Sequence, residues 1–165
     1  AYCGCVNITG SPVCGNNVTN MQYTYGQCYN LTGNPVCGEN ITNMYHTYTT
    51  CYNLTGNPVC GNKVTDMSYT YYSCKNLIGS AVCGPNVTNM VSTYESCFNL
   101  SKGVCGPNVQ TMNNTYYNCI NLTEAICGPN VQYMYGTFNN CVNLTNVVIQ
   151  ATNPPAIDQY TFANT

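Results

Sequence analysis

The chain has 165 residues, the length of a single domain, and only 5% of them are charged, with a net charge of −2. Ordinary globular domains carry about 25% charged residues. The lack of a basic cluster argues against a nucleic-acid partner, and no apolar run reaches the roughly 20 residues of a membrane span. Fourteen cysteines indicate an oxidising compartment. Because the chain opens with Ala1, we expect a mature chain whose export signal has been removed, located outside the cell or on its surface.

One unit of 22 or 23 residues recurs along the chain. Its first cysteine series is Cys5, Cys28, Cys51, Cys74, Cys97, Cys119 and Cys141. A unit of this size cannot bury a core alone, but it can when it is stacked on copies of itself. We therefore expect a leucine-rich-repeat-like solenoid over residues 1–144, with short strands and short helical or 3₁₀ turns stacked as about seven coils. Residues 145–165 are expected to form a degenerate terminal coil or docking tail.

Within each unit, the Asn-Leu-Thr segment is expected to be short and extended, ending at a Gly-x-Pro turn. The 22-residue units lose their residue there, over 100–104 and 122–126, which predicts a surface loop. The spacing of Ile41, Met44 and Tyr48 predicts a short helix or 3₁₀ turn. Four apolar columns are expected in the core. They run from Ile8 to Leu144, from Val13 to Ile126, from Val18 with Met21 to Val131 with Met134, and from Tyr25 to Phe138.

The segment Val87-Thr-Asn-Met90, followed by Tyr94, Cys97 and Leu100, is similar to the BspA-type leucine-rich repeats of microbial surface proteins. The resemblance covers about residues 2–144. It implies a leucine-rich-repeat solenoid displayed outside the cell, with a role in adhesion or surface structure. This sequence differs from that family in its tyrosines, in its second cysteine series and in its scarcity of charge.

Ten Asn-x-Ser/Thr sequons are possible acceptors for N-linked glycans where they face solvent. They lie at Asn7, Asn17, Asn30, Asn40, Asn53, Asn86, Asn99, Asn113, Asn121 and Asn143. Two interpretations stay open for each column of asparagines: an inward ladder that satisfies backbone groups between coils, or a glycan acceptor. Hydrated glycans would keep a rod of almost no charge from aggregating.

The second cysteine series consists of Cys14, Cys37, Cys60, Cys83, Cys105 and Cys127. Disulfides are expected to join it to the first series or to link equivalent cysteines of adjacent coils, and sequence cannot choose between these patterns. Both the pairing across eight or nine residues and the vertical pairing leave Cys3 and Cys141 over, at opposite ends of the rod. A Cys3–Cys141 bridge between subunits is therefore expected.

Catalysis is not expected, because His46 is the only histidine and the five carboxylates are solitary; no cofactor or metal is implied. The leading interpretation is a structural protein that polymerises head to tail with copies of itself into a glycan-coated, disulfide-stabilised fibre. A monomeric adhesin or binding module is the first alternative. An ice-binding surface is the second, although its threonine columns are interrupted at Ile78 and Gln110.

Overall fold

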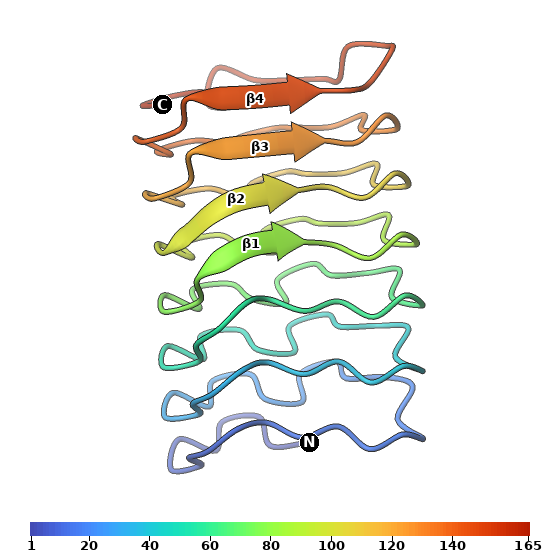
Figure 1. The fold of residues 1–165 in the computed structure, drawn as a ribbon, viewed down its shortest axis with the longest axis vertical. Helices are drawn as coiled ribbons and strands as arrows, with labels where there is room; N and C mark the ends of the chain where they lie inside the picture. The colour runs from blue at the N-terminus through green and yellow to red at the C-terminus, as the bar shows by residue number, and fades with distance from the viewer.

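The computed structural model describes all 165 residues. It contains four short strands and no helix: β1 (Gly79–Val82), β2 (Leu100–Val104), β3 (Glu124–Cys127) and β4 (Asn146–Ile149). They form one parallel sheet in the order β1-β2-β3-β4. Figure 1 shows the chain winding in stacked turns, with the two termini at opposite ends of the stack. The β-rich, parallel architecture agrees with the expected stacking of short strands.

Equivalent positions of successive units lie side by side throughout the stack. The clearest series of isolated parallel bridges joins Asn20, Asn43, Asp66, Asn89, Thr111, Tyr133 and Ala156, each to the next. Parallel neighbours of this kind lie about 4.8 Å apart, so each turn rests directly on the one before it. Three of the four expected apolar columns are buried by this contact, and Leu54, Met67 and Tyr71 are each 0% exposed.

Of the two alternatives expected for the segment around Met44, the short helix does not form, and the chain instead makes turns closed by hydrogen bonds between residues three apart. The chain from Met44 to Leu54 makes separate turns, in which the amide of Thr47 donates to Met44 and that of Cys51 to Tyr48. Within these turns, the amides of His46 and Thr50 donate to the neighbouring unit instead, and the two residues have left-handed φ angles of 52° and 59°. A left-handed residue ends a right-handed helix. The spacing of three and four therefore arises from consecutive turns, each of which returns a side chain to the core.

The valine column from Val13 to Ile126 does not belong to the core, contrary to expectation. Strand side chains alternate between the two faces, and in β1 it is Ala81 that is buried, at 0% exposure, whereas Val82 is 47% exposed. Val13 at the N-terminal end is 73% exposed. The column therefore forms a row of apolar side chains on the outer face of the stack.

The deletion in the 22-residue units lies inside the sheet and not in a surface loop. Residues 100–104 are strand β2, and β3 begins at Glu124. The shorter unit is accommodated by a register shift, in which Gly79 pairs with Leu100 but Ser80 pairs with Lys102. Gly103 is required beside it, because a Cβ atom there would lie 2.5 Å from Cζ of Tyr116.

Candidate functional site

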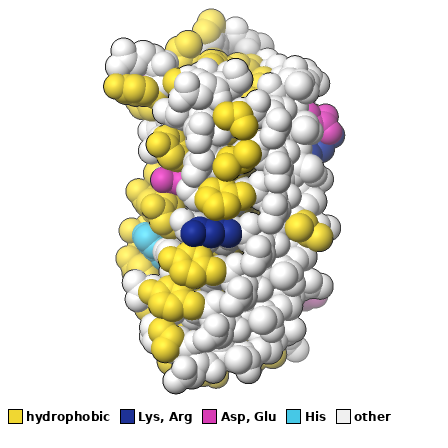
Figure 2. Space-filling model, turned by 90° about the vertical axis from the view of Figure 1, so that its left-hand side faces the viewer, with side chains coloured by type: hydrophobic (Ala, Val, Ile, Leu, Met, Phe, Trp, Pro, Cys, Tyr) yellow, Lys and Arg dark blue, Asp and Glu magenta, His cyan; other side chains and the backbone are white.

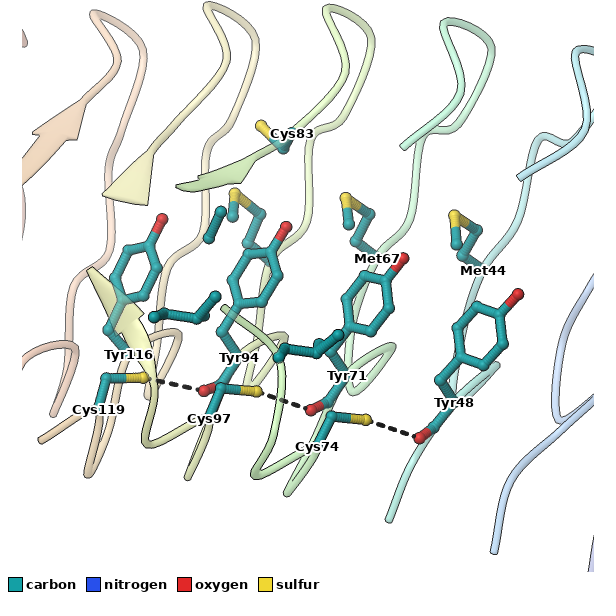
Figure 3. Close-up of a cluster of buried hydrophobic side chains, with 14 of the residues drawn as sticks. Met44, Tyr48, Met67, Tyr71, Cys74, Cys83, Tyr94, Cys97, Tyr116 and Cys119 are labelled. Carbon is teal, nitrogen blue, oxygen red and sulfur yellow. Dashed lines mark hydrogen bonds between the residues drawn. The ribbon is translucent and has the colours of Figure 1, made fainter. Parts of the chain in front are cut away.

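An aromatic column runs along the core from one end of the chain to the other. Tyr25, Tyr48 and Tyr71 stack with ring centroids 5.5 Å apart. Figure 3 shows the rings of Tyr48, Tyr71, Tyr94 and Tyr116 side by side, one from each successive turn. The column begins with Tyr2 against Tyr25 at 5.4 Å and ends with Phe162 against Phe138 at 5.6 Å. Offset stacking of this kind adds to the hydrophobic contribution of each ring.

In the first repeats, each tyrosine hydroxyl of the column hydrogen-bonds to both the amide and the carbonyl of a valine in the preceding segment. The hydroxyl of Tyr71 donates to the carbonyl of Val59 at 2.7 Å and accepts the amide of the same residue at 3.1 Å. Tyr48 does the same for Val36. These hydroxyls take the place of sheet hydrogen bonds where no strand forms, which is a role that the sequence did not reveal.

The hydroxyls of Tyr94 and Tyr116 are buried without a partner. Strands β1 and β2 pair directly at this level, so the backbone groups that would receive a hydroxyl are already used. In the next repeat the equivalent residue is Phe138, which has no hydroxyl to satisfy.

A second ladder, which we call the inner cysteine column, consists of thiols that donate to tyrosine carbonyls of the preceding turn. Cys74 donates to Tyr48, and Cys97 to Tyr71, both at 3.0 Å, as the dashed lines of Figure 3 show. Burial raises the pKa of the Cys51 thiol to about 12. The column comprises Cys28, Cys51, Cys74, Cys97, Cys119 and Cys141.

Buried threonines form a third ladder of hydrogen bonds between turns, which was not predicted from the sequence. Thr70 is 0% exposed, and its hydroxyl donates to the carbonyl of Met44 in the preceding turn at 2.8 Å. Thr93 and Thr115 repeat the contact one turn further each. The dipeptide Thr-Tyr, which recurs in the repeats from Thr24-Tyr25 to Thr115-Tyr116, was the available signal.

The second cysteine series forms the outer cysteine column, near the surface on the strand side. Cys37 and Cys60 are half-buried, while Cys83 and Cys105 are 7% and 6% exposed. The sulfurs of Cys14, Cys37, Cys60 and Cys83 lie over the glycine of the next turn: a Cβ atom on Gly61, for example, would meet the sulfur of Cys37 at 3.0 Å. The Cys-Gly dipeptide is thus one packing unit repeated along the axis.

All fourteen cysteines are free thiols in this structure. Cys5 and Cys3 are exposed at the N-terminal end. Cys141 is not at an end, because it is 0% exposed and donates to the carbonyl of Tyr116 at 3.0 Å. The expected Cys3–Cys141 bridge between subunits would require Cys141 to leave the core, so we do not retain it.

The sequon asparagines lie on the surface and not in an inward ladder. Their amides nevertheless join the turns: Asn86 donates to the carbonyl of Asn62 at 2.7 Å, and Asn143 to that of Ile120 at 2.8 Å. Asn40 and Asn113 are half-buried, and Thr115 in the sequon of Asn113 is 0% exposed. The exposed sequon asparagines are Asn7, Asn17, Asn30, Asn53, Asn86, Asn99, Asn121 and Asn143.

Two further surfaces follow the axis. A groove of about 570 Å³ is lined by polar side chains alone, including Thr65, Asn86 and Gln110. On another face, exposed apolar side chains form a row that a lysine interrupts (Figure 2). Lys75 lies in such a row, with Nζ 4.9 Å from the ring centroid of Tyr52 and 5.7 Å from that of Phe98.

Both end faces of the stack expose apolar side chains. At the N-terminal face, a cavity of about 670 Å³ is lined by Tyr2, Val13 and Met21 among others. At the C-terminal face, Ile157 is 56% exposed and Phe162 41% exposed. We call these surfaces the N-face and the C-face.

The one histidine is packed among aromatic rings. His46 stacks between Tyr23 and Tyr69, at centroid distances of 5.0 and 4.6 Å, and burial lowers its pKa. No three His, Cys, Asp or Glu side chains are grouped so that they could hold a metal ion. None of the segments forms a helix long and apolar enough to cross a membrane.

Comparison of the chain with protein-family models, with curated proteins and with solved structures found no match.

Proposed function

We propose that this protein is an extracellular structural protein: a leucine-rich-repeat-type solenoid of the BspA kind that polymerises end to end into a glycan-coated fibre. The observation that carries the proposal is the aromatic column, which reaches both end faces with a ring left uncovered. Tyr2 is 47% exposed at the N-face, and Phe162 is 41% exposed at the C-face. Each ring offers its free side to a further ring at the spacing that the column already has.

The backbone at the two faces supports the same contact. Inside the stack, the amide of Phe138 donates to the carbonyl of Thr161, and that of Asn140 to Ala163. One turn further, the amides of Phe162 and Asn164 find no acceptor in the chain. With Tyr2 of a second copy placed over Phe162, the same register would offer these amides the carbonyls of that copy's residues 1 and 3.

Such a contact is heterologous, joining the N-face of one copy to the C-face of the next, and it yields a filament when its rotation does not close a ring. The apolar character of both faces fits this arrangement, since an uncovered apolar end costs free energy in water. With a net charge of −2, electrostatic repulsion between copies is weak.

Negative-stain electron microscopy and light scattering of the purified chain test the polymer. We expect filaments, which Tyr2→Asp and Phe162→Asp should each abolish by placing a charge in the ring-on-ring contact. Tyr117→Asp is the matched control, because Tyr117 is 36% exposed and lies away from both faces. A chain that stays monomeric at high concentration would contradict the proposal and favour the monomeric adhesin, for which the polar groove is the candidate surface.

The glycan coat has its own test. An Asn side chain carries two N–H donors, so a glycan on Asn86 leaves one N–H for the carbonyl of Asn62. We expect protein isolated from its native source to have an intact mass above 18.0 kDa that returns toward this value after enzymatic removal of N-linked glycans. A mass of 18.0 kDa before and after treatment would overturn the coat but leave the polymer standing.

A further inference from the structure

The two cysteine columns lie on opposite sides of the core. In Figure 3, Cys74, Cys97 and Cys119 follow one side of the tyrosine and methionine side chains, and Cys83 lies beyond them on the strand side. A bridge between an inner and an outer cysteine would have to cross the packed aromatic column. Pairing between the two columns is therefore incompatible with this fold, which leaves pairs within one column and the two exposed cysteines at the N-terminal end, Cys3 and Cys5.

The inner column is poorly suited to disulfide formation. Its thiols are committed as hydrogen-bond donors, with Cys97 at 3.0 Å from the carbonyl of Tyr71. Cys74 and Cys97 are each 0% exposed, and burial raises both of their pKa values. Since the thiolate is the species that attacks a disulfide, these residues stay as thiols.

One pair of the outer column has a different environment. Cys83 and Cys105 directly follow the paired residues Val82 and Val104 of β1 and β2, and neighbouring parallel strands are about 4.8 Å apart. This separation falls within the Cα range of about 4.4–6.8 Å that a disulfide spans. The backbone pairing alone therefore brings the two side chains within bonding reach.

The sulfur of Cys83 accepts a hydrogen bond from the amide of Gly106 at 2.8 Å, and the thiol of Cys105 donates to the carbonyl of the same glycine at 3.7 Å. Interaction between the two thiols lowers the pKa of Cys83 and raises that of Cys105. By contrast, the pKa of Cys60, one turn below, is raised by burial to about 12. Cys83 is thus the outer cysteine best placed to lose its proton and attack.

We propose that Cys83 and Cys105 are a dithiol site that closes into a disulfide between adjacent turns by exchange with a small-molecule disulfide. The thiolate of Cys83 attacks one sulfur of that disulfide, forms a mixed disulfide and releases one thiol. Cys105 then gives up its proton and attacks the sulfur of Cys83, releasing the second thiol. Two protein thiols are oxidised and one external disulfide is reduced to two thiols. The bridge lies within one chain, so it does not depend on polymerisation.

The test starts from the fully reduced full-length chain, incubated with glutathione disulfide at neutral pH and then quenched in acid. The remaining thiols are alkylated under denaturing conditions, and peptic peptides are analysed by mass spectrometry. We expect one crosslinked peptide pair that joins Cys83 to Cys105, with every inner cysteine alkylated. The oxidised chain should also unfold at a higher urea concentration than the reduced chain.

Matched variants separate the site from the rest of the column. Cys83→Ser and Cys105→Ser should each remove the crosslink, whereas Cys97→Ala, which alters an inner cysteine of the neighbouring turn, should retain it. If a serine variant fails to fold, the crosslink in the unaltered chain still decides the question. Fourteen alkylated cysteines after oxidation, or a bridge between any other two cysteines in place of Cys83–Cys105, would overturn the proposal.

Discussion

The tyrosine hydroxyl of the aromatic column stabilises the fold in repeats where it is hydrogen-bonded and costs free energy in repeats where it is buried without a partner. The hydroxyl of Tyr71 satisfies both backbone groups of Val59, whereas that of Tyr94 is buried with no partner. Removing a buried partner leaves unpaired groups behind, at about 1–3 kcal/mol, but removing an unpaired hydroxyl is close to neutral or stabilising. The equivalent position is already occupied by a phenylalanine at Phe138.

We therefore expect Tyr71→Phe to lower the free energy of unfolding by about 1–3 kcal/mol. Tyr94→Phe, made in the next turn of the same column, should leave it unchanged or raise it slightly. Urea titrations of the two variants, followed by circular dichroism, provide the comparison. Equal losses in both variants would show that ring packing and not hydroxyl pairing governs the column.

The inner cysteine column makes stability depend on alkaline pH. Burial raises the pKa of Cys51 and Cys141 to about 12 in the folded chain, against about 8.5 for a cysteine in an unfolded chain. Between these values the unfolded chain loses the thiol proton and the folded chain keeps it, so stability is complete below about pH 8.5 and is lost as the pH rises toward 12.

We expect the urea midpoint of the reduced chain to decline steadily from about pH 9 upward, with up to about 1.4 kcal/mol per pH unit for each such thiol. Cys51→Ala should make the decline shallower, although it also leaves a cavity that lowers stability at every pH. A midpoint that does not change between about pH 8 and 11 would contradict the raised pKa values.

Among the elements, the repeat spacing predicted stacked short segments, but it left a helix open where only turns form and placed the valine column on the wrong face. The spacing of Ile41, Met44 and Tyr48 is common to one helical face and to a series of turns, and only the left-handed φ of His46 and Thr50 separates the two. Neither residue is a glycine, so no local signal marks the break. The valine row was assigned to the core for a related reason. Alternation of side chains along a strand does not say which of its two faces points inward, and in the structure the cysteines and Ala81 lie on the inner face.

The glycine that follows each outer cysteine sets the spacing of the strand-side segments. A Cβ atom on Gly84 would lie 2.6 Å from the carbonyl oxygen of Gly61, whereas one on Gly15 in the first turn would meet only Val18, at 3.8 Å. Gly84→Ala should therefore cost about 1–3 kcal/mol through forced separation of two turns, and Gly15→Ala should be tolerated. Thermal unfolding of the two variants measures the difference, and a tolerated Gly84→Ala would show that adjacent turns can move apart freely.

For the whole molecule, hydrogen bonds and apolar burial between turns stabilise the fold, and ion pairs contribute little. The single ion pair, between Lys102 and Glu124 at 2.9 Å, is partly exposed, and such pairs contribute about 0–1 kcal/mol. With only 5% charged residues, the sequence offers few groups for ion pairs. It could not predict the ladders of Tyr, Thr and Cys side chains, because donors and acceptors are matched only once the register between turns is known.

We expect stability to be nearly independent of ionic strength. Raising the salt concentration from about 0.05 M to about 1 M with sodium chloride reduces the Debye length to about 3 Å, yet it should shift the urea midpoint very little. Lys102→Ala should likewise change the free energy of unfolding by less than about 1 kcal/mol. A strong salt dependence would mean that charges matter more to the stack than the single ion pair indicates.

The direction of the hydrogen bonds between turns also fixes how the molecule would respond to force. These bonds run along the long axis, as between the amide of Tyr48 and the carbonyl of Thr70, so tension applied at the two ends would load them one turn at a time and not in parallel. The chain should then extend by unzipping in regular steps, each releasing about 75 Å of contour length for a unit of 22 or 23 residues. Single-molecule stretching would record a sawtooth in which the spacing between peaks gives the length of one unit and the number of peaks counts the repeats.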